Sequence, residues 1–358
     1  MNIKNHNLLK NFKNKKIIIT GNTGFKGSWL SLIFAYCGAK VLGISYGKTT
    51  NPSLFHVLKL NNRIKCANID VKNYTKFKNK VETFKPDFIF HLAAEAIVKR
   101  AYAKPLLTWE TNTLGTINLL EILRTTNHKI VTVFITSDKV YRNEEIFRGY
   151  KETDILGDYD PYGASKASAD LAIQSYTKSF LYKKNNLRIG IARAGNIIGG
   201  GDWSEGRLLP DIIKNWSKNK KLIIRNPNST RPWQHVFEII SGYLILALRL
   251  KKQKLLNGQS FNFGPSSKNS IRVIDIVKYL KTKWVNAKFK IKRNKNLKEA
   301  SLLKLNSNKS KKLLKWKSKL TLTKTLDYTI DWYREYYKNP KKIYQYSLDQ
   351  LQIYFNLK

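Results

Sequence analysis

Short apolar runs alternate with longer amphipathic stretches at the start of the chain. Lys16 to Thr20 (KIIIT) is a β-branched run that predicts a buried strand, and Lys40 to Ser45 predicts a second strand. Between them, Ser28 to Ala39 carries apolar residues at helical spacing, with Gly38 where a helix C-cap is expected. This order predicts a strand–helix–strand unit.

The same alternation continues to about residue 194. Further strands are predicted at residues 88–93, 130–137 and 188–193, and helices at residues 107–125 and 165–180. Strands that alternate with helices predict an α/β fold with a doubly wound parallel sheet of the Rossmann type. After Asn196 the rhythm changes to loops, short strands and helices, ending in an aromatic helix at residues 321–337.

This change predicts two interleaved domains. We expect a dinucleotide-binding Rossmann domain over residues 1–194, with return segments near residues 229–265. A smaller substrate domain is expected over residues 195–228 and 266–358.

The composition excludes some functions. The chain has 358 residues and a formal net charge of +42, but its lysines are spread along the sequence and far outnumber its arginines. Base readout prefers arginine, so we expect no nucleic-acid partner, although a basic DNA-binding module is the rival that charge alone suggests. We expect neither a membrane span nor a signal peptide. Cys37 and Cys66 lack metal-ligand spacing, so no metal and a reducing, cytoplasmic location are expected.

A glycine-rich turn lies between the first strand and the first helix. Residues 21–27 read GNTGFKG, a GxxGxxG pattern in the context where glycines let a backbone approach a pyrophosphate at a helix N-terminus. We favour a dinucleotide site over an ordinary tight turn. The candidate cofactor ligands in this turn are Gly21, Thr23, Gly24, Phe25, Lys26 and Gly27.

The sequence does not identify which residue would bind the ribose of the dinucleotide. The second strand ends at Ser45, where dinucleotide-binding proteins often carry a carboxylate for the ribose hydroxyls. The choice between NAD and NADP therefore stays open at this position. Asp70 could contact the adenine, or it could be an ordinary loop or N-cap aspartate; position alone favours neither.

Two groups of polar residues predict acid–base chemistry. Tyr162 and Lys166 lie one helical turn apart, where an ammonium lowers the pKa of a phenol. Such pairs are common by chance, and this one gains weight from its place in the fold. Ser137, Asp138 and Lys139 follow a predicted strand, at the sheet edge where ligands bind in open α/β folds.

Seven motifs then match a known family. The chain resembles the extended short-chain dehydrogenases, and most closely the sugar-nucleotide dehydratases that act on CDP-glucose. The matching stretches are residues 20–30 (TGNTGFKGSWL), 91–94 (HLAA), 111–116 (TNTLGT), 136–141 (TSDKVY), 160–166 (DPYGASK), 193–203 (RAGNIIGGGDW) and 231–236 (RPWQHV).

The resemblance implies a redox-neutral elimination with NAD as the cofactor. Tyr162, helped by Lys166 and Ser137, would let NAD oxidise the sugar at C4; Lys139 would remove the C5 proton, Asp138 would protonate the leaving C6 hydroxyl, and hydride would return to C6. We expect Lys166 and the cofactor to lower the pKa of Lys139 so that it can act as a base. The product would be a 4-dehydro-6-deoxy sugar for surface polysaccharides such as lipopolysaccharide.

The resemblance also implies further ligands and an assembly. Further cofactor-binding residues would be Asp70, Val71, Leu92, Ala93, Ala94, Asn112, Tyr162 and Lys166. Asn196, Arg207 and Arg231 would bind the substrate diphosphate, where the arginine fork suits oxyanions. Helices near Trp109 and Ser168 would form a homodimer or a homotetramer.

Two related activities are the nearest rivals. A sugar-nucleotide 4-epimerase would share the fold, the cofactor and the Tyr162–Lys166 pair, but it needs no acid to expel the C6 hydroxyl. Asp138 and Lys139 therefore argue against it. A dehydratase for a dTDP- or GDP-sugar would differ in the pocket that holds the base.

Overall fold

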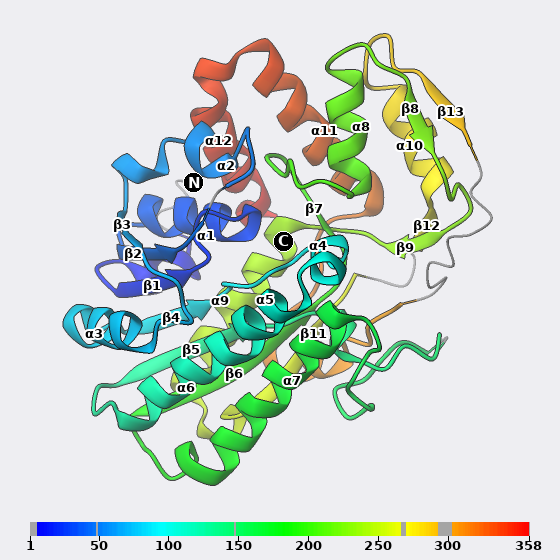
Figure 1. Ribbon diagram of the computed structural model, residues 1–358. Helices are drawn as coiled ribbons and strands as arrows, with labels where there is room; N and C mark the ends of the chain where they lie inside the picture. The colour runs from blue at the N-terminus through cyan, green and yellow to red at the C-terminus, as the bar shows by residue number, and fades with distance from the viewer. Residues whose placement is uncertain (1–5, 48, 147, 266–269, 293–302, 358) are drawn as a thin grey trace.

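A seven-stranded sheet forms the centre of the molecule (Figure 1). The computed structural model describes residues 6–47, 49–146, 148–265, 270–292 and 303–357. Every strand pairing in the sheet is parallel, and the strand order is β11-β6-β5-β4-β1-β2-β3. The strands are β1 (Lys16–Thr20), β2 (Lys40–Ser45), β3 (Lys65–Asn68), β4 (Phe88–His91), β5 (Ile130–Ile135), β6 (Leu187–Ala194) and β11 (Gln259–Phe263).

Helices cover both faces of this sheet. The helices are α1 (Phe25–Tyr36), α2 (Leu54–Val57), α3 (Tyr74–Phe84), α4 (Val98–Ala103), α5 (Pro105–Trp109), α6 (Gly115–Thr125), α7 (Pro161–Tyr176), α8 (Leu208–Trp216), α9 (Val236–Lys252), α10 (Val273–Lys281), α11 (Leu322–Lys338) and α12 (Ile343–Asn356). In β1, Ile17 and Ile19 pack in the core that contains α1 and α9, whereas Ile18 packs in the core with α3 and α6. Because successive strand residues point to opposite faces, one continuous apolar run fills both cores.

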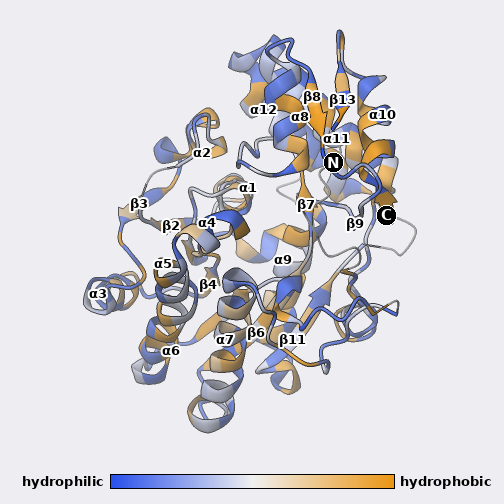
Figure 2. Ribbon diagram, turned by 45° about the vertical axis from the view of Figure 1, so that its right-hand side comes forward, coloured by the Kyte–Doolittle hydropathy of each residue, from blue (hydrophilic) through white to orange (hydrophobic). Residues whose placement is uncertain are grey.

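Short strands and helices form a second layer beside the sheet. The short strands are β7 (Ile197–Ile198), β8 (Leu222–Ile224), β9 (Thr230–Pro232), β10 (Gln234–His235), β12 (Ser270–Arg272) and β13 (Phe289–Ile291). Figure 2 shows hydrophobic colour on β6 and β8; β6 is almost entirely buried, whereas in β8 Leu222 and Ile224 are buried and Ile223 between them is exposed. None of the helices in the described residues is long and apolar enough to cross a bilayer.

The predicted fold class is confirmed, with shifted element boundaries. The strands expected at 16–20 and 40–45 are β1 and β2 with the same bounds. The helix expected from Ser28 begins at Phe25, because Gly24 serves as its N-cap. The helix expected from Ser165 begins at Pro161, since the Asp160 side chain caps it and proline suits the first helical position.

The helix predicted over residues 107–125 is not continuous. It consists of α5, a π-helical segment at Glu110–Leu114, and α6. The helix expected to end at residue 180 likewise closes with a π-helical segment at Thr177–Leu181. Apolar periodicity shows that a segment is helical but does not register such local changes of hydrogen bonding.

The sheet reverses its winding between β1 and β4. The chain passes from β1 to β2 and β3 in one direction, and through β4, β5 and β6 in the other. The Thr20 hydroxyl lies 2.9 Å from His91 Nδ1 and accepts hydrogen bonds from the Leu92 and Ala93 amides, both at 3.1 Å. Open α/β sheets bind ligands at such a switch point, so the candidate site lies there.

Candidate active site

The glycine turn after β1 has the shape of a pyrophosphate cradle. Gly21 has a positive φ of 71°, and a Cβ there would lie 2.9 Å from the Ala93 amide nitrogen. A Cβ on Gly27 would lie 2.1 Å from the Gly21 carbonyl oxygen, so only glycine fits both positions. The first N–H groups of α1 have no acceptor within the helix and are available to an anion.

A cavity of about 500 Å³ opens beside this turn, at the ends of β2 and β3. Its lining includes Asn22, Thr23, Ser45, Cys66 and Asn68. The Ser45 hydroxyl donates to Asn22 Oδ1 at 2.7 Å and accepts from the Thr23 amide at 3.3 Å. The cavity can therefore receive an adenosine, with neutral polar groups in place of the usual carboxylate.

The remaining expected cofactor ligands lie near the same edge of the sheet. Asp70 Oδ1 accepts the Lys72 amide at 2.9 Å, and its other oxygen lies 3.8 Å from Lys72 Nζ. Val71 is buried, and its side chain fills the space beside Gly115. Leu92, Ala93 and Ala94 are half-buried behind the glycine turn.

Asn112 is held within the protein. Its Oδ1 accepts the Glu95 amide at 2.8 Å, and its Nδ2 donates to the Glu95 carbonyl at 3.1 Å and to Ser165 Oγ at 2.9 Å. These contacts join the segment after β4 to helix α7. Asn112 therefore holds the Glu95 segment against helix α7, next to the cofactor site.

Tyr162 and Lys166 meet the end of β5. Both side chains are buried on one face of α7, and Lys166 Nζ donates to the Ile135 carbonyl at 3.1 Å. Burial lowers the pKa of Lys166 to about 8, with Asp170 opposing the shift. Burial also raises the pKa of the Tyr162 phenol, although a hydrogen bond with Ser137 acts in the opposite direction. The structure thus brings Ser137, Tyr162 and Lys166 together.

Asp138 lies buried next to this group. Ser137 Oγ donates to Asp138 Oδ1 at 2.9 Å, and the facing Gly195 leaves room for the carboxylate, since a Cβ there would lie 2.7 Å from Asp138 Oδ2. Burial raises the pKa of Asp138. A carboxyl group with a raised pKa is suited to donate a proton.

The expected pKa shift of Lys139 is wrong in direction. Lys139 Nζ forms an ion pair with Asp160 Oδ2 at 3.0 Å. Burial lowers the pKa of Lys139, but the charges of Asp160, Asp138 and Asp158 outweigh it, so the net shift is upward. Asp158 and Asp160 lie about 20 residues from Lys139 along the chain, so their effect on its pKa depends on the tertiary fold.

Lys26 shows the opposite behaviour. It is the second residue of α1, and burial together with the positive charges of Lys166 and Arg207 lowers its pKa to about 7, against Asp138 and Asp202. Its side chain therefore reaches the acid–base group as well as the glycine turn. The sequence assigned Lys26 to the cofactor alone.

The expected substrate ligands lie on the other side of the acid–base group. Arg207 Nη1 binds Asp202 Oδ2 at 2.9 Å, and its charge partly opposes the rise that burial causes in the pKa of Tyr162. Asn196 is half-buried immediately before β7. Arg231 lies in β9, but its side chain is outside the described part of the structure.

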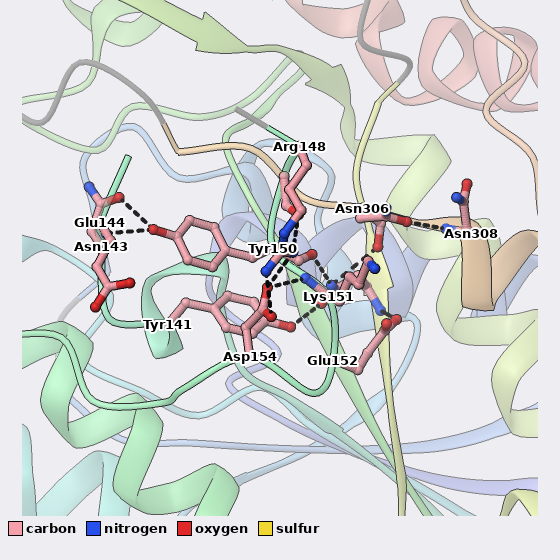
Figure 3. A network of polar contacts seen from close by, with 12 residues as sticks. Tyr141, Asn143, Glu144, Arg148, Tyr150, Lys151, Glu152, Asp154, Asn306 and Asn308 are labelled. Atoms are coloured by element: carbon pink, nitrogen blue, oxygen red, sulfur yellow. Dashed lines mark hydrogen bonds and ion pairs between the residues drawn. The ribbon is translucent and has the colours of Figure 1, made fainter. Parts of the chain in front are cut away.

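A buried ion pair behind Lys166 was missed from the sequence. Arg193 Nη2 lies 2.7 Å from Asp170 Oδ1, and both side chains have zero exposure. Arg193 also donates to the Tyr141 hydroxyl at 2.8 Å and to the Glu152 carbonyl at 3.2 Å. Figure 3 shows Tyr141 and Glu152 within the polar network of the loop that follows the Ser137–Lys139 segment.

Signals for the missed residues existed in the sequence. Asp160 directly precedes Pro161, a combination typical of a helix N-terminus, and its position marks the start of α7. Asp170 continues the spacing of Tyr162 and Lys166 by one more turn. Within the described residues there is no group of three or more histidine, cysteine or acidic side chains that could hold a metal ion.

A glycine cradle at the switch point, next to a tyrosine–lysine pair, defines an extended short-chain dehydrogenase fold with an acid–base site. The chain belongs to the GDP-mannose 4,6 dehydratase family, which it matches over residues 18–329. It is 39% identical over 331 residues to the CDP-glucose 4,6-dehydratase of Salmonella typhimurium, a match covering 91% of this chain and 92% of that protein.

Solved structures of related enzymes share the fold. The epimerase Mth375 of Methanothermobacter thermautotrophicus superposes with a TM-score of 0.79 at 20% identity, covering 94% of this chain and 97% of that one. The dTDP-glucose 4,6-dehydratase of Bacillus anthracis, solved in complex with NAD, gives a TM-score of 0.74 at 22% identity, covering 92% and 99%. The Rossmann-type architecture predicted from the sequence is confirmed.

Proposed function

We propose that this chain is a CDP-glucose 4,6-dehydratase that uses NAD. The observation that carries the proposal is the acid–base group: Ser137, Asp138 and Lys139 lie beside Tyr162 at the switch point. An epimerase needs only the tyrosine and its lysine, whereas a dehydratase also needs groups for the C5 proton and the C6 hydroxyl. The Salmonella relative supports CDP-glucose as the substrate.

The residues present fit NAD. The glycine cradle has no side chain that would block a pyrophosphate, and the neighbouring cavity can take the adenosine. The turn from Gly21 to Gly27 would hold the diphosphate, Ser45 and Asp70 would lie at the adenosine end, and Tyr162 with Lys166 at the nicotinamide end. When bound, NAD supplies the reversible hydride acceptor that makes the net reaction redox-neutral.

The side chains of the protein carry the proton transfers. The Lys166 ammonium stabilises Tyr162 as the phenolate, which accepts the proton of the C4 hydroxyl and becomes the neutral phenol. The ketone formed at C4 acidifies the C5 proton, which passes to the Lys139 amine. Asp138 gives its proton to the C6 hydroxyl, which leaves as water. Asn196, Arg207 and Arg231 hold the substrate diphosphate.

The organisation of the protein follows from this function. Residues 1–194 with 229–265 would bind the cofactor, and residues 195–228 with 266–358 the sugar nucleotide. The surface near α5 and α7 carries exposed Leu106, Trp109 and Leu171, which suits a homodimer or homotetramer interface. A cytoplasmic location suits both the nucleotide substrate and deoxysugar synthesis for surface polysaccharides.

A product assay tests the proposal. The purified protein is incubated with NAD and, separately, with CDP-, dTDP-, GDP- and UDP-glucose, and the products are weighed by mass spectrometry. Loss of one water from CDP-glucose alone is the expected result. Unchanged mass with an altered sugar configuration would identify an epimerase instead, and turnover of another nucleotide sugar would reassign the substrate.

A further inference from the structure

We propose that Asp160 is a positioning residue that couples the two proton-transfer groups, holding Lys139 in place with one oxygen while capping the helix that carries Tyr162 with the other. The inference rests on the proposed dehydratase function, in which Lys139 handles the C5 proton and Tyr162 the C4 hydroxyl proton. Asp160 acts through Lys139 and the N-terminus of α7 and does not itself take part in the proton transfers.

The geometry at Asp160 divides its two oxygens between two tasks. Oδ1 accepts the amides of Tyr162 and Gly163, both at 3.0 Å, which is the N-cap arrangement of α7. Oδ2 accepts the Lys139 ammonium at 3.0 Å. The Asp160 side chain is only 11% exposed, whereas that of Lys139 is 34% exposed. The more deeply buried Asp160 side chain therefore holds the more exposed Lys139 side chain.

The first turn of α7 is built to bring these groups close. A Cβ on Gly163 would lie 2.8 Å from the Lys139 carbonyl oxygen and 2.7 Å from Asp158 Cβ, so only glycine allows the approach. The segment that leads to Asp160 is fastened to Val140, whose carbonyl accepts the Gly157 amide at 2.8 Å. The segments that carry Lys139 and Asp160 are thus held together by a backbone hydrogen bond as well as by the ion pair.

The charges around Lys139 determine its protonation. Asp138 faces it from its own segment, Asp158 from the loop before α7, Asp160 from the N-cap, and the Tyr162 phenol from α7. Asp160 is the one within hydrogen-bonding distance. Together the three carboxylates raise the pKa of Lys139, so the ammonium predominates at neutral pH and the amine appears as pH rises.

Removing only the charge of Asp160 should lower the pKa of Lys139. Asparagine is as good an N-cap as aspartate, so Asp160→Asn keeps the helix start while it removes the ion pair. The pKa of Lys139 then falls, and the amine is available at lower pH. The acid limb of the dehydration rate therefore moves to lower pH, while the plateau rate falls because Lys139 is no longer held.

The experiment compares Asp160→Asn with wild type and with two further variants. Asp160→Ser also keeps a capping side chain without charge and serves if the first variant fails to fold. Asp154→Asn is the matched control, because it removes a carboxylate of the same loop that pairs with Arg148 rather than Lys139. Solvent deuterium incorporation at C5 and kcat are measured from pH 6 to about 11.5, a range that extends beyond the ordinary lysine pKa of about 10.4.

An activity-independent measurement accompanies the kinetics. Reductive ¹³C-methylation labels the lysines, and the NMR signal missing from Lys139→Arg identifies Lys139, whose titration is then followed in each variant. We expect the pKa of Lys139 to be lower in Asp160→Asn and Asp160→Ser and unchanged in Asp154→Asn. An unchanged pKa, or an acid limb that stays in place while the plateau drops, overturns the inference. Absence of CDP-glucose dehydration by the wild type refutes the proposed function alone, since the titration remains readable.

Discussion

Asp170→Asn removes one charge from the buried ion pair behind Lys166. The Asp170 carboxylate accepts Arg193 Nε at 2.8 Å and Nη2 at 2.7 Å, Gln174 Nε2 at 2.8 Å, and the Thr136 hydroxyl at 3.2 Å. Asparagine would turn an NH₂ group toward some of these donors and leave the guanidinium without its counter-charge. Breaking a fully buried pair in this way costs about 3–5 kcal/mol.

The size of the effect can be expressed as a melting temperature. At about 2.1 cal/mol/K of unfolding entropy per residue, a chain of 358 residues has roughly 0.75 kcal/mol/K in total. A loss of about 4 kcal/mol therefore lowers the Tm by ~5 °C. Calorimetry measures the Tm, and urea unfolding gives the change in the free energy of unfolding.

Two controls separate charge from packing. The Arg148–Asp154 ion pair lies on the surface loop, with 46% and 16% of its side chains exposed, so Asp154→Asn should cost less than about 1 kcal/mol. The double variant Asp170→Leu/Arg193→Met removes both buried charges and should be more stable than Asp170→Asn. A loss below about 1 kcal/mol in Asp170→Asn, or a double variant less stable than the single one, would refute the reasoning.

Three further predictions follow from the site. Gly27→Ala should weaken NAD binding at least about tenfold in calorimetric titration, because its Cβ would lie 2.1 Å from the Gly21 carbonyl oxygen; an affinity equal to that of wild type would contradict this. Tyr162→Phe should lower kcat about 10²- to 10⁴-fold with NAD affinity retained; normal turnover would exclude Tyr162 as the proton acceptor. Burial lowers the pKa of His91 to about 3, so the unfolded state binds a proton that the folded state does not, and the free energy of unfolding falls by about 1.4 kcal/mol for each pH unit below 6.5. The His91→Gln variant lacks this contribution and should lose less stability on acidification than wild type. Equal changes in the urea midpoints of the two proteins between pH 7 and 4.5 would contradict this.

The glycine turn could be predicted because all of its information is contiguous. The strand, the three glycines and the helix follow one another directly, and the backbone requirements at Gly21 and Gly27 belong to that stretch. The Tyr162–Lys166 pair is similarly local, since helical spacing puts both side chains on one face. These parts of the site need no knowledge of distant segments.

The electrostatics could not be predicted in the same way. The pKa of Lys139 depends on Asp160, 21 residues further on, and the expected sign was wrong because that contact is set by how α7 packs against the segment after β5. The Arg193–Asp170 pair spans 23 residues and joins β6 to α7. Sequence spacing identifies candidate groups, but only the tertiary arrangement decides which charges face each other.

The predicted bounds of the helix at residues 107–125 were wrong for a related reason. The segment around Glu110–Leu114 changes to π-helical hydrogen bonding, and Asn112 within it reaches both Glu95 and Ser165. The positions of Glu95 and Ser165 are set by β4 and α7, which are distant in sequence. Apolar periodicity contains nothing about such contacts.

Trp29 in α1 constrains how the nascent chain can fold on the ribosome. Its indole N–H donates to the Gly200 carbonyl at 3.0 Å, its ring lies 6.4 Å from that of Trp332 in α11, and Gly200 itself packs against Trp332. At 5–20 residues per second, roughly 15–60 s separate the synthesis of the two tryptophans. During that interval the strand–helix unit that carries the pyrophosphate cradle exposes the apolar surface that Trp332 and its neighbours later cover, so a chaperone that binds apolar segments has a binding site there until α11 is made.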